Sequence, residues 1–483
     1  MTRTQYIGGQ LVSGGSTETI DVHDPATGRV IGEVNAASTA DIDIAVDAAR
    51  RAFERGEWQG RGVHDRGDIM MQFAERVREH SGELAALEVR DNGMPLQLAK
   101  FMIESAVGCL RYHAGIVNKL HGISTDLSTP EQEMHAYTRR EPVGVVASVT
   151  PWNAPFATLI AKLAPALAAG CSVVCKPAEQ TPLSATRLGE LLYEWKLFPD
   201  GQINIVNGLG PVAGAALTSH PNVDKVSFTG STAVGRKLIE AASGNLKRLT
   251  LELGGKSPMF IFEDADLDLA IPAAATAIFM NSGQVCIAGS RLFVQRSIFE
   301  LVVERLGQAG AAMRLGNGFD PQTQMGPLVS EQQMLRVLSY VQSGIAEGAE
   351  LVGGGGGGGR HGEQGYFVRP AVFANRDGAD LRIARDEIFG PVLVAMPFDS
   401  LEDVARLANE TEYGLGAGVF TRDISKAHRA AKIIRAGNVW INCYGVLDKS
   451  MPFGGFKQSG WGRESGFDGV TGYLETKSVY AAL

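Results

Sequence analysis

Residues 143–176 read VGVVASVTPWNAPFATLIAKLAPALAAGCSVVCK, and this stretch decides the fold class. Residues 143–149 form a short, mostly apolar run that is typical of a buried strand, and residues 171–175 form a second one. Between them, residues 156–169 are apolar over a length that suits a helix. Strand, helix and strand in this order predict two parallel strands of one sheet with a covering helix.

The alternation of helix and strand continues on both sides of this stretch. The predicted helices are 40–55, 65–80, 82–91, 95–118, 182–195, 211–219 and 236–242, and the further strands are 203–206 and 225–228. A second alternating set runs from about 256 to 450. The sequence therefore predicts a two-lobed α/β protein.

Length and composition limit the classes of protein to be considered. A chain of 483 residues is too long for one ordinary core, so two or three domains are expected. Hydrophobic residues make up 45% and charged residues 20%, as in folded globular proteins. The net charge is −8 and no basic stretch stands out, so nucleic acid is not an expected partner.

The cysteines and the apolar segments bear on location. The 5 cysteines form no CxxC pair, and an odd number of thiols in a large chain favours the reducing cytoplasm. The N-terminus has no apolar segment of the signal-peptide kind. The most apolar stretches, near 157–171 and 269–280, are too short or are interrupted by Lys162 and Pro165, so no membrane span is expected.

Two glycine-rich segments lie at predicted strand–helix junctions. Residues 228–235 read FTGSTAVG, follow a strand and precede the helix at 236–242. Backbone N–H groups and the helix dipole at such a junction suit a pyrophosphate, although the GxxxxG spacing also fits an ordinary turn. In residues 208–214, GLGPVAG, Pro211 removes an amide donor, and the segment is interpreted as a helix-initiating turn.

A charged pair follows the strand at 171–175. Lys176 and Glu179 lie where this strand ends, and parallel sheets hold their ligands at that edge. An ammonium and a carboxylate there are placed to bind ribose hydroxyls. The alternative is a solvated ion pair without a function.

A cysteine and a glutamate are candidates for chemistry. Cys286 lies among small and apolar residues in NSGQVCIAGSR, residues 281–291, and is either a buried small hydrophobe or a nucleophile. Glu252 is flanked by leucines in LELGGKSP, residues 251–258. Burial of such a carboxyl raises its pKa towards the range of a general base, and costs free energy unless the group is paired or catalytic.

Asn153 is the third candidate. It lies between two prolines in TPWNAP, residues 150–155, so its amide is held in a stiff turn. A preorganised N–H donor of this kind can stabilise an oxyanion. The alternative is that Asn153 only stabilises the turn.

Taken together, these segments resemble the aldehyde dehydrogenase superfamily over essentially the whole chain, in the family's order. The matching segments are PWNAP (151–155), KPAE (176–179), FTGSTAVG (228–235), LELGGK (251–256), GQVC (283–286), EIFGP (387–391) and PFGGFK (452–457). Chance would rarely produce all of them in order. The resemblance implies a Rossmann-like parallel-sheet cofactor domain, an α/β catalytic domain and a small β oligomerisation arm.

The resemblance also implies a reaction, the NAD(P)-dependent oxidation of an aldehyde to the carboxylic acid. Cys286 would attack the aldehyde carbon, and Asn153 with the Cys286 backbone N–H would stabilise the oxyanion. Glu252 would activate the water that hydrolyses the resulting thioester. Lys162 and Glu464 resemble a proton path from Glu252. No metal motif such as HExxH occurs in the sequence, so no metal is expected.

Several positions match the family's cofactor site. Lys176 and Glu179 match residues that bind the adenosine ribose. The Glu179 carboxylate would repel a 2′-phosphate, so NAD is favoured, although some members with this glutamate also accept NADP. The other matching positions are Trp152, Gly230, Ser231, Gly235, Glu387 and Phe389.

Three alternatives remain to be weighed. In a CoA-acylating semialdehyde dehydrogenase CoA resolves the thioester, but members of that kind typically lack a glutamate at the Glu252 position. A non-catalytic family member is disfavoured because Cys286, Glu252 and Asn153 are all present. The YxxxK match at 473–477 suggests a tyrosine-based reductase, but it lies in a strand-like segment without an N-terminal glycine fingerprint, so chance explains it better.

Domain boundaries and oligomeric state also follow from the resemblance. The cofactor domain is expected at 1–119 with 143–254 and the catalytic domain at 255–469. The polar segment 120–142 and the strand-like tail 470–483 are expected to form an exposed two-stranded arm. Such an edge invites pairing with a second subunit, so a dimer or a tetramer is expected.

Two further features concern surfaces. The run of glycines from Gly353 to Gly359 is interpreted as a flexible surface loop without a function. Near the expected substrate pocket, this chain has Ala154 and Ala161 where some acetaldehyde-type enzymes have aromatic residues, with Leu447 and Trp461 close by. Smaller wall residues suggest room for a bulky or branched aldehyde.

Overall fold

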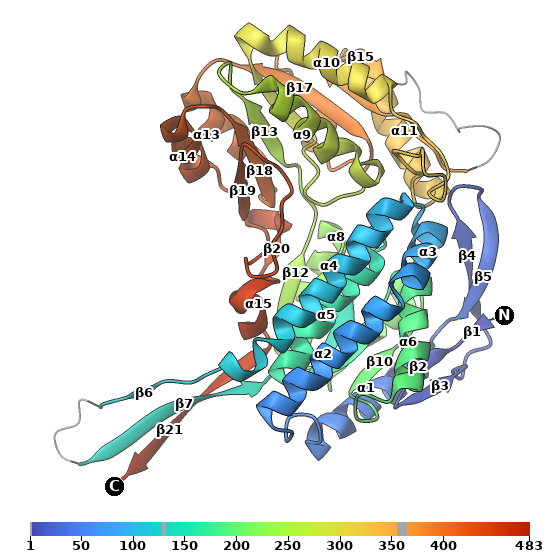
Figure 1. Ribbon diagram of the computed structural model, residues 1–483, viewed down its shortest axis with the longest axis vertical. Helices are drawn as coiled ribbons and strands as arrows, with labels where there is room; N and C mark the ends of the chain where they lie inside the picture. The colour runs from blue at the N-terminus through green and yellow to red at the C-terminus, as the bar shows by residue number, and fades with distance from the viewer. Residues whose placement is uncertain (1, 128–131, 355–364) are drawn as a thin grey trace.

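The computed structural model describes residues 2–127, 132–354 and 365–483. Two α/β lobes face each other, and a narrow arm projects from the lower lobe in Figure 1, with the C-terminus at its end. The two large sheets have eight and seven strands. The predicted two-lobed α/β class is confirmed.

The first sheet has a parallel centre with antiparallel edges. Strands β12, β11, β8, β9 and β10 are parallel, and β20, β2 and β3 are added antiparallel at its two edges. The bounds are β2 (Gln5–Ile7), β3 (Gln10–Val12), β8 (Val145–Val149), β9 (Ser172–Lys176), β10 (Ile203–Ile205), β11 (Lys225–Thr229), β12 (Arg248–Glu252) and β20 (Gly460–Trp461). The four strands predicted between 143 and 228 are confirmed. The edge strands were not predicted, because short edge strands carry little apolar periodicity.

Helices cover this sheet. They are α1 (Thr39–Arg55), α2 (Val63–Glu79), α3 (Ser81–Asn92), α4 (Leu96–Ala114), η1 (Val117–Lys119), α5 (Pro155–Ala169), α6 (Leu183–Trp195), η2 (Gly210–Gly214), α7 (Ala215–Ser219) and α8 (Thr232–Ala242). The turn at 208–214 does start a helix, as a π-helical turn that α7 continues. Helix α8 begins four residues before the predicted 236, because the Ser231 hydroxyl accepts a hydrogen bond from Val234 N at 3.3 Å and caps the helix directly after the glycine turn.

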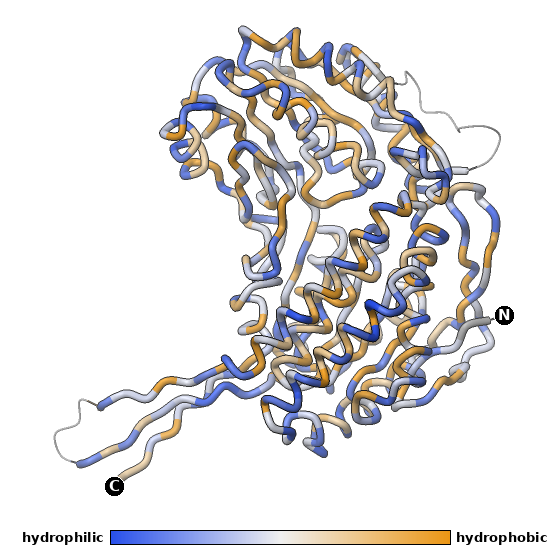
Figure 2. The backbone as a smooth tube through the Cα atoms, in the orientation of Figure 1, coloured by the Kyte–Doolittle hydropathy of each residue, from blue (hydrophilic) through white to orange (hydrophobic). Residues whose placement is uncertain are grey.

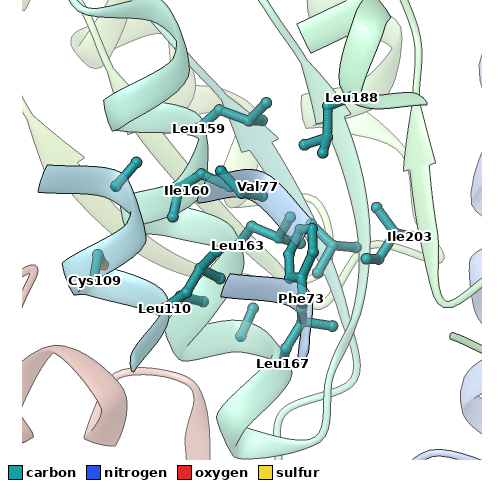
Figure 3. Close-up of a cluster of buried hydrophobic side chains, with 14 of the residues drawn as sticks. Phe73, Val77, Cys109, Leu110, Leu159, Ile160, Leu163, Leu167, Leu188 and Ile203 are labelled. Atoms are coloured by element: carbon teal, nitrogen blue, oxygen red, sulfur yellow. The ribbon is translucent and has the colours of Figure 1, made fainter. Parts of the chain in front are cut away.

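The largest apolar cluster lies between this sheet and α2, α4 and α5. Figure 3 shows Phe73 and Val77 of α2 and Leu110 of α4 converging on Leu163 and its neighbours in α5. Helix α5 is apolar on most sides, with Lys162 as its one charged residue, and this is typical of a helix enclosed by other elements. Burial of each such side chain stabilises the fold by about 1.5–3 kcal/mol. The core thus fixes α5, whose first turn follows Asn153.

The second sheet is parallel except for one edge strand. The order is β15-β16-β17-β14-β13-β18-β19, with β15 antiparallel to β16. The strands are β13 (Pro258–Ile261), β14 (Arg291–Gln295), β15 (Glu350–Gly354), β16 (Ala371–Ala374), β17 (Val392–Phe398), β18 (Gly416–Phe420) and β19 (Asn438–Ile441). The helices are α9 (Leu267–Phe279), η3 (Met280–Gly283), η4 (Arg296–Ile298), α10 (Phe299–Ala311), α11 (Glu331–Ala346), α12 (Arg382–Arg385), α13 (Leu401–Asn409), α14 (Ile424–Ile433) and η5 (Lys457–Ser459).

The glycine run enters this sheet, which corrects part of the surface-loop interpretation. Gly353 and Gly354 belong to β15. A Cβ at Gly353 would stand 2.4 Å from the Gly307 Cα of α10, so a side chain cannot be accommodated there. The rest of the run, 355–359, lies outside the described residues.

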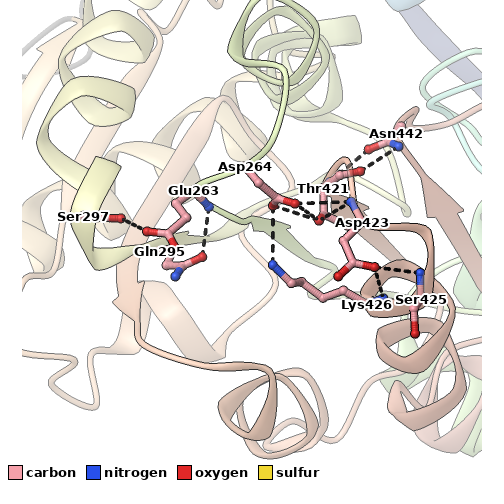
Figure 4. A network of polar contacts seen from close by, with 9 residues as sticks. All are labelled: Glu263, Asp264, Gln295, Ser297, Thr421, Asp423, Ser425, Lys426 and Asn442. Carbon is pink, nitrogen blue, oxygen red and sulfur yellow. Dashed lines mark hydrogen bonds and ion pairs between the residues drawn. The ribbon is translucent and has the colours of Figure 1, made fainter.

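Polar side chains connect the carboxyl ends of β13, β18 and β19 in the second sheet (Figure 4). Thr421 follows β18, and its hydroxyl donates to both carboxylate oxygens of Asp264 at 2.8 Å. Asn442, after β19, accepts from Thr421 N at 3.0 Å and donates to Thr421 O at 3.0 Å. Lys426 forms an ion pair with Asp264 at 3.6 Å. At this edge the polar side chains of the protein therefore bind one another.

The arm is an antiparallel sheet of three strands rather than the two expected. Strand β7 (Met134–Pro142) pairs with β21 (Leu474–Ala482) over its length and with the short β6 (Ser124–Thr125) on its other side. Hydrophilic and hydrophobic stretches alternate along these strands (Figure 2). The strand starts at 474, whereas residues 470–471 still belong to α15 (Gly466–Thr471).

Two smaller features complete the fold. Strands β1 (Thr2–Arg3), β5 (Arg29–Asn35) and β4 (Thr19–Asp24) form a separate three-stranded sheet. Residues 460–461, which fall within the range expected for the catalytic domain, pair as β20 with β12 of the first sheet.

Within the described ranges, every helix is too short or too polar to cross a membrane.

Candidate active site

The first sheet has a topological switch point at β8. The chain adds β9 and β10 on one side of β8 and then β11 and β12 on the other. Ligands of parallel α/β sheets bind in the crevice that such a reversal opens at the carboxyl ends of the strands. The loop after β8 carries Asn153, and the turn after β11 carries Gly230 and Ser231. Asn153, Gly230 and Ser231 therefore lie at the same carboxyl edge of the first sheet.

Cys286 follows a segment of unusual backbone. Asn281, Ser282 and Gly283 all have left-handed conformations, with φ values of 49°, 57° and 73°. Two consecutive non-glycine residues in this region store strain, which persists only where the surroundings hold the backbone in place.

Side chains and neighbouring backbone hold this loop. The Ser282 hydroxyl donates to Gly326 O at 2.7 Å, and Gln284 Oε1 accepts from Val329 N at 2.9 Å. Both Ser282 and Gln284 are buried. The loop before Cys286 is thus fixed by residues about 45 positions away in sequence.

Asn153 is linked to the same loop from the first lobe. Its side-chain amide nitrogen donates to Gln284 O at 2.8 Å, and its backbone carbonyl accepts from Asn281 Nδ2 at 2.8 Å. An asparagine amide has two N–H donors, and no second hydrogen bond of this one is present among the described residues. One donor therefore stays available beside the Cys286 loop.

The Cys286 thiol is half-buried, in an apolar cluster with Trp440 and Ile287. Burial raises the pKa of the Cys286 thiol to about 12, and the negative charges of Glu252 and Glu387 also raise it. The thiol is therefore protonated at neutral pH in this structure. To act as a nucleophile, Cys286 needs a nearby base.

Glu252, at the end of β12, is the nearby carboxyl. Its side chain is buried, and neither carboxylate oxygen has a hydrogen-bond partner among the described residues. Burial raises the pKa of Glu252 well above its ordinary value. The charge of Glu464 raises the pKa further, whereas Lys162 and Arg463 lower it. A buried acid without a partner costs free energy, which marks a candidate functional group.

Lys162 and Glu464 form a buried ion pair behind Glu252. Lys162 is fully buried in α5, and its ammonium also donates to the Ser227 hydroxyl at 3.3 Å. The Tyr473 hydroxyl donates to Ser227 Oγ at 3.1 Å. The structure thus brings both predicted proton-path residues close to Glu252 and adds Ser227 and Tyr473 to the cluster.

Lys176 and Glu179 face each other at the end of β9. Their charged groups lie 3.6 Å apart, and Lys176 Nζ also donates to Pro177 O at 2.8 Å. Lys176 is buried, while Glu179 is half-buried. A Cβ at Gly214 would lie 3.4 Å from the Lys176 side chain, so the π-helical turn packs directly against the pair.

The turn before α8 is shaped by its glycines. A Cβ at Gly235 would stand 2.7 Å from the Leu253 side chain, so glycine lets the first turn of α8 approach β12 closely. Gly230 N donates to Glu252 O at 3.0 Å. Ser231 caps α8, and the first N–H groups of the helix have no intrahelical partner. Such a helix start attracts anionic groups.

Glu387 and Phe389 approach the site from the second lobe. Glu387 Oε1 accepts from Gly255 N at 3.0 Å, and burial raises the pKa of this carboxyl. Phe389 has a left-handed φ of 60°, and its ring meets the Trp152 ring edge-on at 5.1 Å. These residues border the Asn153 loop.

The groups around this crevice fit a dinucleotide. Carboxylates at Glu179 and Glu387 can accept hydrogen bonds from ribose hydroxyls, and the start of α8 can take a pyrophosphate. Gly235 lets the first turn of α8 pack closely against Leu253.

Comparison with known proteins identifies the family. The model of the "Aldehyde dehydrogenase family" matches residues 11–479. The chain belongs to the aldehyde dehydrogenase family. It is 46% identical to a putative aldehyde dehydrogenase, DhaS, from Bacillus subtilis over 483 residues, covering 100% of this chain and 96% of the relative. It is 45% identical to retinal dehydrogenase 2 from Homo sapiens over 478 residues, covering 98% of this chain and 90% of the relative.

Solved aldehyde dehydrogenases share the fold. The NAD+ complex of an aldehyde dehydrogenase from Bacillus cereus superposes with a TM-score of 0.96 at 45% identity, covering 100% of this chain and 97% of that structure. The aldehyde dehydrogenase-like fold predicted from the sequence is confirmed. So is the reaction class, an NAD(P)-dependent oxidation of aldehydes to carboxylic acids.

Several site residues were not predicted from the sequence. Asn281 and Gln284 hold Asn153, and Ser227 joins the Lys162 pair. Tyr473 was noticed only as part of the YxxxK match. Its hydroxyl lies in the buried cluster, whereas Lys477 forms an ion pair with Glu141 on the arm, so the two do not share a site.

Proposed function

We propose that this aldehyde dehydrogenase forms a covalent thioester on Cys286 and hydrolyses it with water that Glu252 deprotonates. One observation carries the proposal. Glu252 is a buried carboxyl without a hydrogen-bond partner among the described residues, and its charge acts on the Cys286 thiol. A carboxyl with a raised pKa next to a protonated thiol is an acid–base pair.

In the first step, Cys286 Sγ attacks the aldehyde carbon. The thiol proton passes to a base. The charges of Glu252 and Glu387 both act on the thiol, and Glu252 is the one whose carboxylate oxygens have no hydrogen-bond partner among the described residues. The carbonyl oxygen becomes an oxyanion, which the free N–H of Asn153 and the Cys286 backbone N–H stabilise. The strained loop before Cys286 keeps the nucleophile and the Asn153 amide in fixed relation.

In the second half of the reaction the adduct is oxidised and released. When bound, NAD+ would supply the acceptor for the hydride of the substrate carbon, and loss of this hydride would turn the tetrahedral adduct into a thioester. Glu252 first loses the proton that it took from the thiol. It then takes a proton from water, and the hydroxide attacks the thioester carbon. The C–S bond breaks, the Cys286 thiolate takes the proton back from Glu252, and the carboxylic acid leaves.

The residues that would hold the cofactor lie on both lobes. Lys176 and Glu179 would bind the adenosine ribose, and Gly230, Ser231 and Gly235 would shape the pyrophosphate site. Glu387, Phe389 and Trp152 would hold the nicotinamide ribose end. Because the Glu179 carboxylate repels a 2′-phosphate, NAD is favoured over NADP, which stays possible.

The Lys162–Glu464 pair would carry the proton away from Glu252. Its ion pair is buried, it touches Ser227, and both charges act on Glu252. Glu252 must lose the thiol proton before it can take a proton from water, and this cluster offers groups that exchange protons.

The substrate proposed is a bulky or branched aldehyde. Ala154 and Ala161 are small, and Leu447 and Trp461 are exposed by 51% and 53%. The relative named retinal dehydrogenase 2 acts, by its name, on a long apolar aldehyde. The test compares kcat/KM for acetaldehyde and for a long or cyclic aldehyde, in the wild type and in Ala161→Phe. A preference of the wild type for acetaldehyde would remove this proposal.

Hydrolysis rather than transfer to CoA is proposed because Glu252 is present. An assay with CoA should yield the free acid and no acyl-CoA. A non-catalytic role is disfavoured because Cys286, Glu252 and Asn153 are all present.

The proposed assembly is a dimer or a tetramer formed through the arm. Strand β21 has a partner only on its β7 side among the described residues, so its other edge offers free backbone groups. Light scattering that shows only a 51.4 kDa monomer would contradict this. The domain boundaries at 119, 142, 254 and 469 and the cytoplasmic location stay proposals.

The decisive experiment measures NAD reduction over a panel of aldehydes, beside a Cys286→Ser variant. The wild type should reduce NAD with at least one aldehyde, and the variant should not. Intact-mass analysis after quenching should show an acyl adduct on the wild type. Unchanged turnover in Cys286→Ser, or a persistent absence of the adduct, would overturn the proposed mechanism.

A further inference from the structure

Two polar side chains at the end of α3 have no part in the mechanism above. Glu88 and Asn92 are each 0% exposed, although residues of these types are seldom fully buried. They are four positions apart and therefore lie on the same face of the helix, one turn apart. Each of them has a hydrogen bond to a residue near Asn153, and Glu88 has a second one to Ser184 of α6.

Asn92 holds the residue before Asn153. Its amide donates to Trp152 O at 2.8 Å, and the Thr181 hydroxyl donates more weakly to the same oxygen at 3.4 Å. The Asn92 side-chain oxygen has no partner among the described residues, so the contact with Trp152 is the one that orients this amide. Asn92 therefore sets the peptide plane from which the Asn153 side chain projects.

Glu88 holds the helix that begins after Asn153. Its Oε1 accepts from Phe156 N at 3.3 Å and from the Ser184 hydroxyl. Phe156 N is one of the first N–H groups of α5, and the N-cap residue, Ala154, provides no side-chain acceptor. Glu88 thus caps α5 from a different helix.

The two contacts bracket Asn153, one residue before it and three residues after it. The same end of α3 also reaches the loop that holds the nucleophile. A Cβ at Gly93 would stand 2.6 Å from Pro327, next to Gly326, whose carbonyl accepts from Ser282. The end of α3 therefore contacts the segments that hold the two partners of the proposed oxyanion site, the Asn153 turn and the support of the Cys286 loop.

We propose that Glu88 and Asn92 are positioning residues that set the place of the Asn153 amide relative to Cys286. The inference rests on the function proposed above for Asn153. An oxyanion donor acts only within about 2.7–3.1 Å of the developing charge, and displacements of about 1 Å can cost a hundredfold in rate. Loss of either contact removes a hydrogen bond that holds the turn between β8 and α5. It leaves the side chains of Cys286 and Glu252 unchanged.

The experiment compares Asn92→Ala and Glu88→Ala with two controls. Arg90→Ala lies on the same helix but is exposed, and should leave kcat unchanged. Glu88→Gln keeps an oxygen acceptor for Phe156 N and Ser184 Oγ, and should restore most of the activity. All rates are taken per reactive thiol, so that a loss of folded protein does not count as a loss of kcat.

For Asn92→Ala and Glu88→Ala we expect kcat to fall at least about tenfold while KM changes less than about threefold, since the lost interaction concerns the transition state. A primary isotope effect with a [1-²H]aldehyde should rise, because less of the adduct is present to pass its hydride and hydride transfer then limits turnover more. A kcat within about threefold of wild type per reactive thiol, in whichever of the two variants folds, overturns the inference. So does a loss that Glu88→Gln does not restore.

Failure of the proposed function looks different. If Cys286→Ser keeps its turnover, the mechanism itself is wrong. If Cys286→Ser is inactive while Asn92→Ala and Glu88→Ala are normal, only the positioning role is wrong.

Discussion

The two parallel sheets of this aldehyde dehydrogenase use opposite edges. In the first sheet, the candidate site residues stand at the carboxyl ends of strands: Asn153 after β8, Lys176 at the end of β9 and Glu252 at the end of β12. In the second sheet they precede strands: Cys286 before β14 and Glu387 before β17. The carboxyl edge of the second sheet is closed by the Asp264–Thr421 network (Figure 4).

This difference shows that a shared architecture does not fix which edge carries chemistry. The first sheet reverses its strand order at β8 and opens a crevice there. At the carboxyl edge of the second sheet, polar side chains satisfy each other and leave few groups for a ligand. A nucleophile loop at its other edge can meet the crevice of the first sheet, as the Asn153–Gln284 hydrogen bond shows.

The largest effect is expected at the amino edge of the second sheet. Cys286→Ser should lower kcat at least about a thousandfold, because a hydroxyl is a far weaker nucleophile than a thiolate. NADH formation with the preferred aldehyde measures it. Cys443→Ser is the matched control, since Cys443 is half-buried in the same apolar cluster and should keep kcat within about twofold. A comparable loss in both variants would mean that the cluster, rather than the Cys286 thiol, is being disturbed.

A large effect on hydrolysis of the thioester is expected from Glu252, at the carboxyl edge of the first sheet. Glu252→Gln removes the base, so hydrolysis of the thioester should slow by about a hundredfold to ten-thousandfold. Because the thiol also loses its base, the adduct should form more slowly than in the wild type. Rapid mixing should show at most one NADH per active site before turnover nearly stops, and the acyl adduct that does form should persist. Steady turnover at the wild-type rate would show that another group activates water.

A smaller effect is expected from the buried ion pair of Lys162 and Glu464. Removing either charge should shift the pH profile of kcat, in opposite directions for the two residues. Glu252 must be deprotonated to act, so kcat should rise with pH through its raised pKa. Lys162→Met removes a charge that lowers this pKa and should shift the profile to higher pH. Glu464→Gln removes a charge that raises it and should shift the profile to lower pH. Shifts in the same direction would contradict the electrostatic account.

The smallest effect on activity is expected at the carboxyl edge of the second sheet. Thr421→Val keeps the shape of the side chain but removes its hydrogen bonds to Asp264. The free energy of unfolding should fall by about 1–2 kcal/mol, measured by urea denaturation, while kcat stays within about twofold. A large fall in kcat would show that this edge also takes part in function.

The sequence predicted the elements better than their ends and their partners. Apolar runs of strand length gave β8, β9, β10 and β11, because buried parallel strands are apolar on both faces. The start of α8 was missed by four residues, since a single serine cap decides it. The short strand β20 carries no periodicity and forms because β12 offers a free edge.

The candidate site shows the same division. The residue types at Cys286, Glu252 and Asn153 and the order of their motifs are in the sequence, and they sufficed to predict the family and the reaction class. The burial that raises the pKa of Glu252, the left-handed loop before Cys286 and the bond from Asn92 to Trp152 appear only in the fold. These depend on groups far apart in the chain, and local patterns do not record which distant groups will meet, because packing of whole lobes decides that contact.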